Sequence, residues 1–208
     1  MDKFEGPQGM RSEYRIGLVR KEGPTMNSTM AQDTIAAIST PVAAGGIGMV
    51  RVSGPDALKV VDRVFTAVSG KQAEDTPGYR GLFGRVHDGQ GEIDEAVVFV
   101  YRAPKSYTGE DVAEICCHGG IYLVQRTLRA CLNAGARAAQ AGEFTRRAFL
   151  NGKMDLSSAE AVQDLIAATA RRGAASAMEQ LQGGLRKRIE DLESRLLDAL
   201  SGIDAAID

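Results

Sequence analysis

Strand-forming patterns stop at one point of this chain, and that break constrains the fold more than any other feature of the sequence. Up to Lys153, short β-prone runs alternate with helical ones, whereas beyond it the apolar residues recur only with helical spacing. We therefore predict two folded regions, residues 31–150 with strands and helices and residues 151–208 with helices alone. Residues 1–30 mix glycine, proline and charged residues without an apolar period, which predicts a disordered extension or a start assigned too early.

The first folded region contains patterns of both kinds. Its β-prone runs are 34–38, 49–53, 80–87, 95–101 and 112–117, and its helical runs are 57–65 and 122–132. The glycines between the third and fourth β-prone runs supply the positive φ that a hairpin turn needs, so these two runs are expected to pair. Because strands and helices are intermixed without a regular βαβ order, we predict an α+β fold rather than a doubly wound parallel sheet.

The helical region opens with a Ser-x-x-Glu sequence. Ser157 and Glu160 have the spacing of a capping box in front of apolar residues, and the glycine pair at 183–184 is expected to interrupt the helix. An apolar stripe follows at spacings of four and three, with Asp191 and Arg195 able to pair on its flank: Leu185, Ile189, Leu192, Leu196, Ile203 and Ile207. Such a stripe requires a partner, which we expect to be a further segment of protein or another subunit.

Composition limits the class of protein. The net charge is -2 and the sequence pI about 5.8, so no overall positive field attracts nucleic acid, and RNA contact would need a local basic patch or another protein. No run reaches the roughly 18 apolar residues of a membrane helix, and the first residues lack the order of a signal peptide, so we expect a cytoplasmic protein without membrane contact. The 3 cysteines suit neither a disulfide framework nor zinc spacing and are expected to be reduced.

Three charged residues are candidates for ligand binding. Alternation places Glu114 on one strand face with Val112 and Cys116, where it either reaches solvent from an edge strand or accepts paired N–H groups of a heterocycle through its two oxygens. Arg51 lies on one face of another strand, and Lys153 lies in a turn ahead of a helix. Taken singly, solvation explains each of these two cations better than a ligand does.

Other reactive patterns are weaker. His118 follows the adjacent Cys116 and Cys117, but neighbouring cysteines do not readily share tetrahedral zinc and His87 is the only other histidine. We therefore predict no catalytic residue and no metal ligand. No GxxxxGK[ST] phosphate loop occurs in the sequence, so this chain alone is not expected to hydrolyse a nucleotide.

A series of motifs in a fixed order resembles the bacterial and organellar family of tRNA-modification GTPases called MnmE or TrmE. The resemblance runs from about Asp33 to Asp208. It includes Gly46–Gly54 (GIGMVRVSG), Ser106–Asp111 (SYTGED), His118–Gly120 (HGG), Gly142–Phe144 (GEF), Arg147–Asn151 (RAFLN) and Lys153–Leu156 (KMDL). Any one of these motifs is weakly specific, whereas their succession over one span is strongly specific.

The resemblance implies an N-terminal domain with a fold like the tetrahydrofolate-binding aminomethyltransferases, followed by the first helices of an all-α domain. Such an N-terminal domain dimerises and binds 5-formyl- or 5,10-methylene-tetrahydrofolate, the one-carbon source for modifying the wobble uridine (U34) of certain tRNAs. Matched by motif, Arg51, Glu114 and Lys153 correspond to folate-contacting residues. On this basis residues 31–150 are expected to be the folate-binding and dimerisation domain, and residues 151–208 a partial helical domain.

The resemblance also implies partners that lie outside this chain. The family acts as a homodimer with the flavin enzyme MnmG (GidA) and with tRNA, and its GTP, potassium and magnesium are held by a G domain whose motifs this sequence lacks. Neither Cys116 nor Cys117 belongs to the family motif, so neither inherits the role of the family's C-terminal cysteine. Two alternatives stay open, a free-standing aminomethyltransferase-like enzyme and a purely structural dimerisation module.

Overall fold

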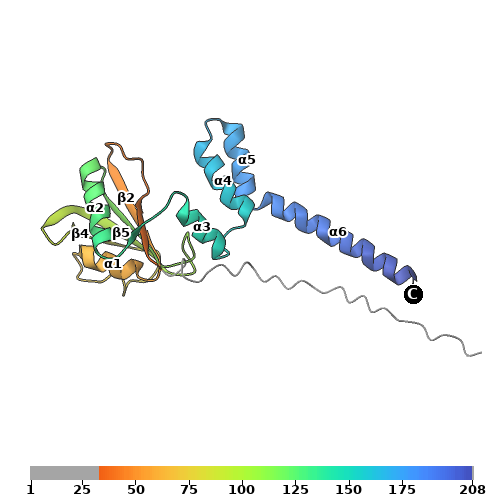
Figure 1. Cartoon of the computed structure of the whole chain (residues 1–208), viewed down its shortest axis with the longest axis horizontal. Helices are drawn as coiled ribbons and strands as arrows, with labels where there is room; N and C mark the ends of the chain where they lie inside the picture. The colour runs from red at the N-terminus through yellow and green to blue at the C-terminus, as the bar shows by residue number, and fades with distance from the viewer. Residues whose placement is uncertain (1–32, 208) are drawn as a thin grey trace, which may run out of the picture.

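The computed structural model describes residues 33–207, so the extension expected at 1–30 lies outside the described residues. Within that range the chain forms β1 (Ile35–Ile38), β2 (Ile47–Ser53), α1 (Ala57–Val64), β3 (Phe65–Ala67), β4 (Arg80–His87), β5 (Glu92–Tyr101), β6 (Val112–His118), α2 (Ile121–Asn133), β7 (Arg137–Ala138), α3 (Glu143–Leu150), α4 (Leu156–Ala167), α5 (Arg171–Leu181) and α6 (Gly184–Ile207). All the strands precede α3, and only helices follow it (Figure 1). This order confirms the predicted change from mixed to helical structure.

The strands form one sheet in the order β3-β4-β5-β6-β2-β1-β7. Neighbouring strands are antiparallel except β1 and β7, which are parallel. The predicted hairpin is present as β4 and β5, with a register irregularity at Val86–His87. A largely antiparallel sheet is expected of an α+β domain and excludes the doubly wound parallel alternative.

The main core lies between one face of the sheet and the helices α1 and α2 (Figure 1). Alternate residues of the central strands point into it, including Val50 and Val52 of β2 and Ala113 and Ile115 of β6, all fully or almost fully buried. The helices contribute buried aliphatic residues such as Val61. The core therefore fixes the register of the central strands, and with it the row of side chains on the opposite face.

That opposite face carries the residues at the intervening positions. In β2, β6 and β5 the aligned residues Arg51, Glu114 and Phe99 form one row across the sheet. Because β6 lies between β5 and β2, Glu114 is on a central strand, and the interpretation of an edge-strand glutamate reaching solvent was wrong. Phe83 of β4, at 53% exposed, and Phe99, at 41%, leave part of this face apolar and open to solvent.

Three short elements were not predicted. The helical run expected to reach Phe65 ends at Val64, because Phe65 turns to extended backbone and pairs with Val86 as the start of β3. The strand β7 has only 2 residues, too few for a pattern to show. Helix α3 begins after Gly142, which has the left-handed φ of 71° that glycine tolerates.

The predicted capping box at the start of the helical region was wrong. Helix α4 begins at Leu156, two residues earlier than a Ser157 cap would place it, and its N-cap is Asp155, whose carboxylate accepts the Ser158 N–H at 2.7 Å. The Ser157 hydroxyl donates to the same carboxylate rather than capping the helix itself. A carboxylate at the N-cap suits the positive end of the helix dipole better than a hydroxyl, which explains why Asp155 takes the position.

The rest of the helical region follows the predicted order in part. The glycine pair at 183–184 separates α5 from α6 as expected, but a further break at 168–170 divides α4 from α5. Helix α6 extends away from the sheet (Figure 1), and the side chains of its apolar stripe from Leu185 to Ile203 are 48% to 65% exposed. Within the described residues the ion pair on this helix joins Arg186 to Glu190 rather than the expected Asp191 to Arg195.

Candidate functional site

Arg51 of β2 and Glu114 of β6 lie directly opposite each other on adjacent strands. The Arg51 Nε and Nη2 groups donate to the same carboxylate oxygen, Glu114 Oε1, at 2.9 and 2.7 Å. Their side chains are only 23% and 13% exposed, so the pair is largely removed from water. Hydrogen bonds between ionised groups are stronger than neutral ones, and each partner of a buried pair depends on the other for its charge balance.

The second oxygen of Glu114 is bound by a tyrosine of the next strand. Tyr101 of β5 donates its hydroxyl to Glu114 Oε2 at 3.2 Å, and Tyr79 packs edge-on against the Tyr101 ring with 5.8 Å between centroids. Burial, and after it the negative charge of Glu114, raise the pKa of the Tyr101 phenol. At neutral pH the phenol is therefore protonated and is available as a donor.

Two aromatic rings cover the Arg51 guanidinium. Its Cζ lies 5.2 Å from the centroid of the Tyr107 ring and 5.5 Å from that of Phe144. Tyr107 comes from the loop between β5 and β6, and Phe144 comes from the first turn of α3. Both distances are within the range of cation–π attraction, so a loop and a helix together hold the cation in place.

Lys153 reaches this region indirectly. Its exposed Nζ donates to the carbonyl oxygen of Pro104 at 3.0 Å, in the loop that carries Tyr107. The neighbouring Asn151 donates its side-chain amide to the carbonyl of Thr108 in the same loop, at 2.7 Å. Thus Arg51 and Glu114 are in direct contact, whereas Lys153 is brought to the loop beside them.

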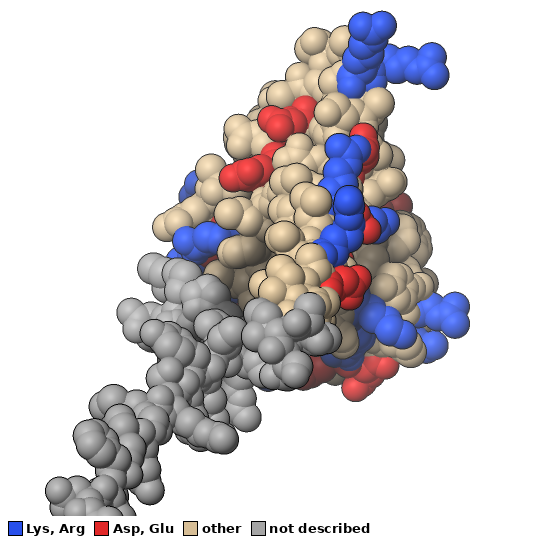
Figure 2. All heavy atoms as spheres, turned by 90° about the vertical axis from the view of Figure 1, so that its right-hand side faces the viewer, with Lys and Arg blue, Asp and Glu red and all other residues tan. Residues whose placement is uncertain are grey.

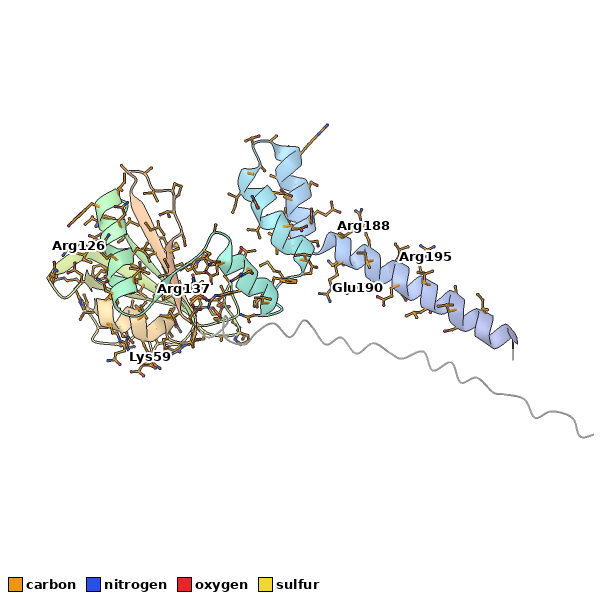
Figure 3. The ribbon with its side chains drawn as sticks, viewed as in Figure 1. Lys59, Arg126, Arg137, Arg188, Glu190 and Arg195 are labelled. Atoms are coloured by element: carbon orange, nitrogen blue, oxygen red, sulfur yellow. The ribbon has the colours of Figure 1, made fainter. Side chains whose placement is uncertain are left out.

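A buried ion network joins the loop to α3. The Arg147 side chain, 4% exposed, contacts three carboxylates, with Nη2 at 2.5 Å from Asp33 and 3.2 Å from Glu143 and Nη1 at 3.1 Å from Glu110. Arg137 adds contacts of 2.6 Å to Asp33 and 2.7 Å to Glu143, and lies at the junction of the sheet and α3 (Figure 3). Charged residues of the SYTGED motif and of the segment 142–147 therefore pair with one another inside the protein.

The network holds its carboxylates ionised. Burial alone would raise the pKa of Glu143, but hydrogen bonds from Arg137, from the Gln140 N–H and from Arg147 outweigh it and lower the pKa to about 2. The hydrogen bond from Arg137 is the largest cause of the lowered pKa of Asp33. The carboxylates of Glu143 and Asp33 are therefore ionised throughout the neutral range.

None of the three cysteines is activated as a nucleophile. Burial raises the pKa of Cys116 and of Cys117, and it raises the pKa of Cys131 to about 12, so all three are neutral thiols at pH 7. His118 is an exposed residue whose Nδ1 lies 2.8 Å from Asp94. Residues 33–207 contain no group of three or more His, Cys, Asp and Glu side chains placed to hold a metal ion.

The helical region offers a different kind of surface. A cleft of about 590 Å³ between α3 and α4 is lined mainly by apolar residues, among them Phe149, Leu156 and Ile166.

On the described part of the face in Figure 2, Lys and Arg side chains alternate with Asp and Glu. Arg188, Glu190 and Arg195 follow one another along α6 in the same way (Figure 3). Among the helices of residues 33–207, none combines the length and apolar character needed to cross a membrane.

Fold and site together define a mixed α/β domain with an arginine–carboxylate pair on the open face of its sheet, followed by a helical segment. The family model for the N-terminus of the GTP-binding protein TrmE matches residues 34–153, and the model for the MnmE helical domain matches residues 156–208. The chain therefore belongs to the TrmE/MnmE family, as the resemblance of its motifs predicted.

Individual relatives agree with this assignment. The chain is 48% identical over 180 residues to the tRNA modification GTPase MnmE of Bacteroides thetaiotaomicron, covering 86% of this chain and 38% of the relative. It is 49% identical over 181 residues to the MnmE of Carboxydothermus hydrogenoformans and 47% identical over 178 residues to that of Geobacillus thermodenitrificans, covering 86% and 85% of this chain. The chain thus spans less than two fifths of the length of these relatives, and corresponds to their N-terminal and first helical parts.

Proposed function

We propose that this chain is the folate-binding and dimerising part of a tRNA wobble-uridine modification GTPase. In this proposal residues 31–150 bind 5-formyl- or 5,10-methylene-tetrahydrofolate, and residues 151–208 belong to the helical domain. The observation that carries the proposal is the Arg51–Glu114 pair, which is largely buried on the open face of the sheet with aromatic rings beside it. Removing charged groups from water costs free energy, and charged side chains in largely buried positions are typical of binding sites.

The chemistry of Glu114 suits the pterin end of a folate. A carboxylate accepts through about four lone-pair positions, of which Arg51 uses two on Oε1 and Tyr101 uses one on Oε2. A pterin edge presents adjacent N–H groups in one plane, which match the two oxygens of a carboxylate. Arg51 would share Oε1 with such a donor or turn away from it, and Tyr101 would stay on Oε2.

The two cations suit other groups of the same ligand. Arg51 and Lys153 provide positive charge for the formyl oxygen or the glutamyl carboxylates of folate, and the exposed Lys153 can leave Pro104 at little cost. The rings of Tyr107 and Phe144 provide flat apolar surface next to Arg51. The largely antiparallel sheet with two helices on one face is compatible with an aminomethyltransferase-like fold, which forms part of this proposal.

Dimerisation is the second element of the proposal. The sheet face opposite α1 and α2 exposes Phe83 and Phe99 on adjacent strands, and burying such a face between two copies of the chain would remove apolar surface from water. The exposed stripe of α6 would pack against another helical segment of the parent protein. GTP hydrolysis, with its potassium and magnesium, belongs to a G domain of that parent. MnmG and tRNA are partners in the full complex.

Calorimetric titration with 5-formyl-tetrahydrofolate tests the proposal. We expect saturable binding to the wild-type chain, loss of that binding in an Arg51/Glu114/Lys153 triple alanine variant, and no heat from GTP. A folded dimer without folate binding would leave the structural dimerisation module as the function. Turnover of a folate one-carbon unit onto a small acceptor by this chain alone would instead support the free-standing enzyme.

A further inference from the structure

We propose that Glu110 and Arg147 are positioning residues that hold the Tyr107 and Phe144 rings over Arg51 and thereby set the affinity of the site. The expected effect on affinity rests on the proposed folate function, whereas the placement of the two rings by Glu110 and Arg147 does not depend on any ligand. Neither residue contacts Arg51 or Glu114. Their influence has to pass through the loop and the helix that carry the two rings.

On the loop side, the Glu110 carboxylate is the last acceptor in a series of hydrogen bonds through the hydroxyl groups of Thr108 and Ser53. The Ser53 hydroxyl donates to Glu110 Oε2 at 2.7 Å, and Ser53 Oγ lies 2.7 Å from Thr108 Oγ1. Because Ser53 has one hydroxyl proton and gives it to the carboxylate, Thr108 is the donor in the second contact. The loop residues on either side of Gly109 are thus bound to Ser53, two positions beyond Arg51 on the same strand face.

On the helix side, Arg147 connects the same carboxylate to α3. Its Nη1 lies 3.1 Å from Glu110 Oε1, and its Nη2 lies 3.2 Å from Glu143, one residue before Phe144. A single buried cation therefore joins the loop that carries Tyr107 to the helical turn that carries Phe144. Removing Glu110 breaks this connection, because Arg147 keeps its contacts with Asp33 and Glu143 while the loop loses its contact with Arg147.

A third contact fixes the two rings relative to each other. The Tyr107 hydroxyl lies 2.8 Å from the Thr145 hydroxyl of α3, so the loop and the helix are bound near the rings as well as at Glu110. With both bonds in place, Arg51 is held between two ring faces and against Glu114. Loss of the contact between Glu110 and Arg147 would weaken the attachment of the Tyr107 loop to α3. Arg51 could then leave the position in which it orients the Glu114 carboxylate.

The first test measures geometry without a ligand. The NMR resonance of the Arg51 Hε, assigned by its loss in Arg51→Lys, reports whether an aromatic ring covers the guanidinium. Tyr107→Leu gives the reference shift for removal of one ring. We expect Glu110→Gln to move the resonance in the same direction, and Glu92→Gln, which breaks the exposed pair with Arg85, to leave it in place.

The second test measures 5-formyl-tetrahydrofolate affinity in a double-mutant cycle. We expect Glu110→Gln to weaken binding about tenfold in the wild-type background and less than about twofold in the Tyr107→Leu background, because the two residues act through one element. Ser53→Ala, which keeps every charge, replaces Glu110→Gln if the latter does not fold, with the same expectations. An unchanged Arg51 Hε, or equal losses in both backgrounds, would overturn the positioning role.

The two tests separate this inference from the proposed function. If wild-type protein binds no folate, the proposed function fails together with the effect on affinity, while the Arg51 Hε still decides whether Glu110 positions the rings. If folate binds and the Arg51 Hε does not respond to Glu110→Gln, the positioning role alone is rejected.

Discussion

The Nη2 of Arg51 lies 2.7 Å from Oε1 of Glu114, on directly opposed residues of two central antiparallel strands. The core on the other face of the sheet sets this register, because a slip of either strand by one residue would turn its charged residue into the layer of aliphatic side chains. The pair is thus placed by the packing of residues that do not belong to the site. The contribution of the pair to stability and its role in ligand binding can therefore be tested in separate experiments.

Removal of Glu114 should destabilise the domain as well as affect the site. We expect Glu114→Ala to lower the free energy of unfolding by about 1–3 kcal/mol, since Arg51 and Tyr101 lose their acceptor in a region with little access to water. The double variant with Arg51→Ala should cost less than the sum of the single variants. Urea denaturation of the four proteins measures this coupling, and strictly additive costs would show that the pair is not coupled.

Acid should weaken the network around Arg147 over a defined pH range. Glu143 has a pKa of about 2 in the folded protein against an ordinary value of 4.5, so the stability it contributes is present above about pH 4.5 and is lost as the pH falls toward 2. The difference corresponds to about 3 kcal/mol when fully expressed. Denaturation between pH 2 and 6 should show this loss in the wild type and a smaller one in Glu143→Gln. Equal pH slopes would contradict the assignment.

Replacement of Asp155 tests the corrected helix start. Asp155→Ala removes the acceptor of the Ser158 N–H and should cost about 1 kcal/mol. Ser157→Ala removes only a hydroxyl that donates to Asp155 and should cost less than about 0.5 kcal/mol. Thermal unfolding of both variants distinguishes this arrangement from a Ser157 cap, which would reverse the order.

A glycine in β4 should be intolerant of any side chain. A Cβ at Gly84 would lie 2.2 Å from the carbonyl oxygen of Thr66 and 2.7 Å from the Cα of Ala67, both backbone atoms of β3. We expect Gly84→Ala to destabilise the domain by about 2–3 kcal/mol, because the two strands would have to separate. Gly46→Ala is the matched control, since no atom lies within 4 Å of its added Cβ. Similar melting temperatures for the two variants would rule out this close packing.

Local patterns predicted most of the helices and strands, because the local sequence decides which of the two these segments form. Two β-prone runs joined by glycines predicted the hairpin of β4 and β5, and glycines at 183–184 predicted the break before α6. Strand β3 was missed because Phe65 continues a helical pattern in the sequence and becomes extended only through pairing with β4. Tertiary pairing overrode the local preference at that residue.

The site was predictable in part for the same reason. Alternation placed Arg51 and Glu114 on strand faces, but their contact depends on the pairing of β2 with β6, which the local pattern of neither strand specifies. The network of Arg147 joins residues far apart in sequence, so no local pattern indicates which of its charged members pair. The aromatic residues Tyr107 and Phe144 gave a usable signal, since each lies within a charged, glycine-containing stretch.

A crystal structure of the chain with 5-formyl-tetrahydrofolate tests the central claim most directly. We expect density for the pterin ring with its N–H edge within hydrogen-bond distance of the Glu114 carboxylate and close to the Tyr107 and Phe144 rings. Density for the ligand elsewhere, for example in the cleft between α3 and α4, with the Arg51–Glu114 pair unchanged, would contradict it.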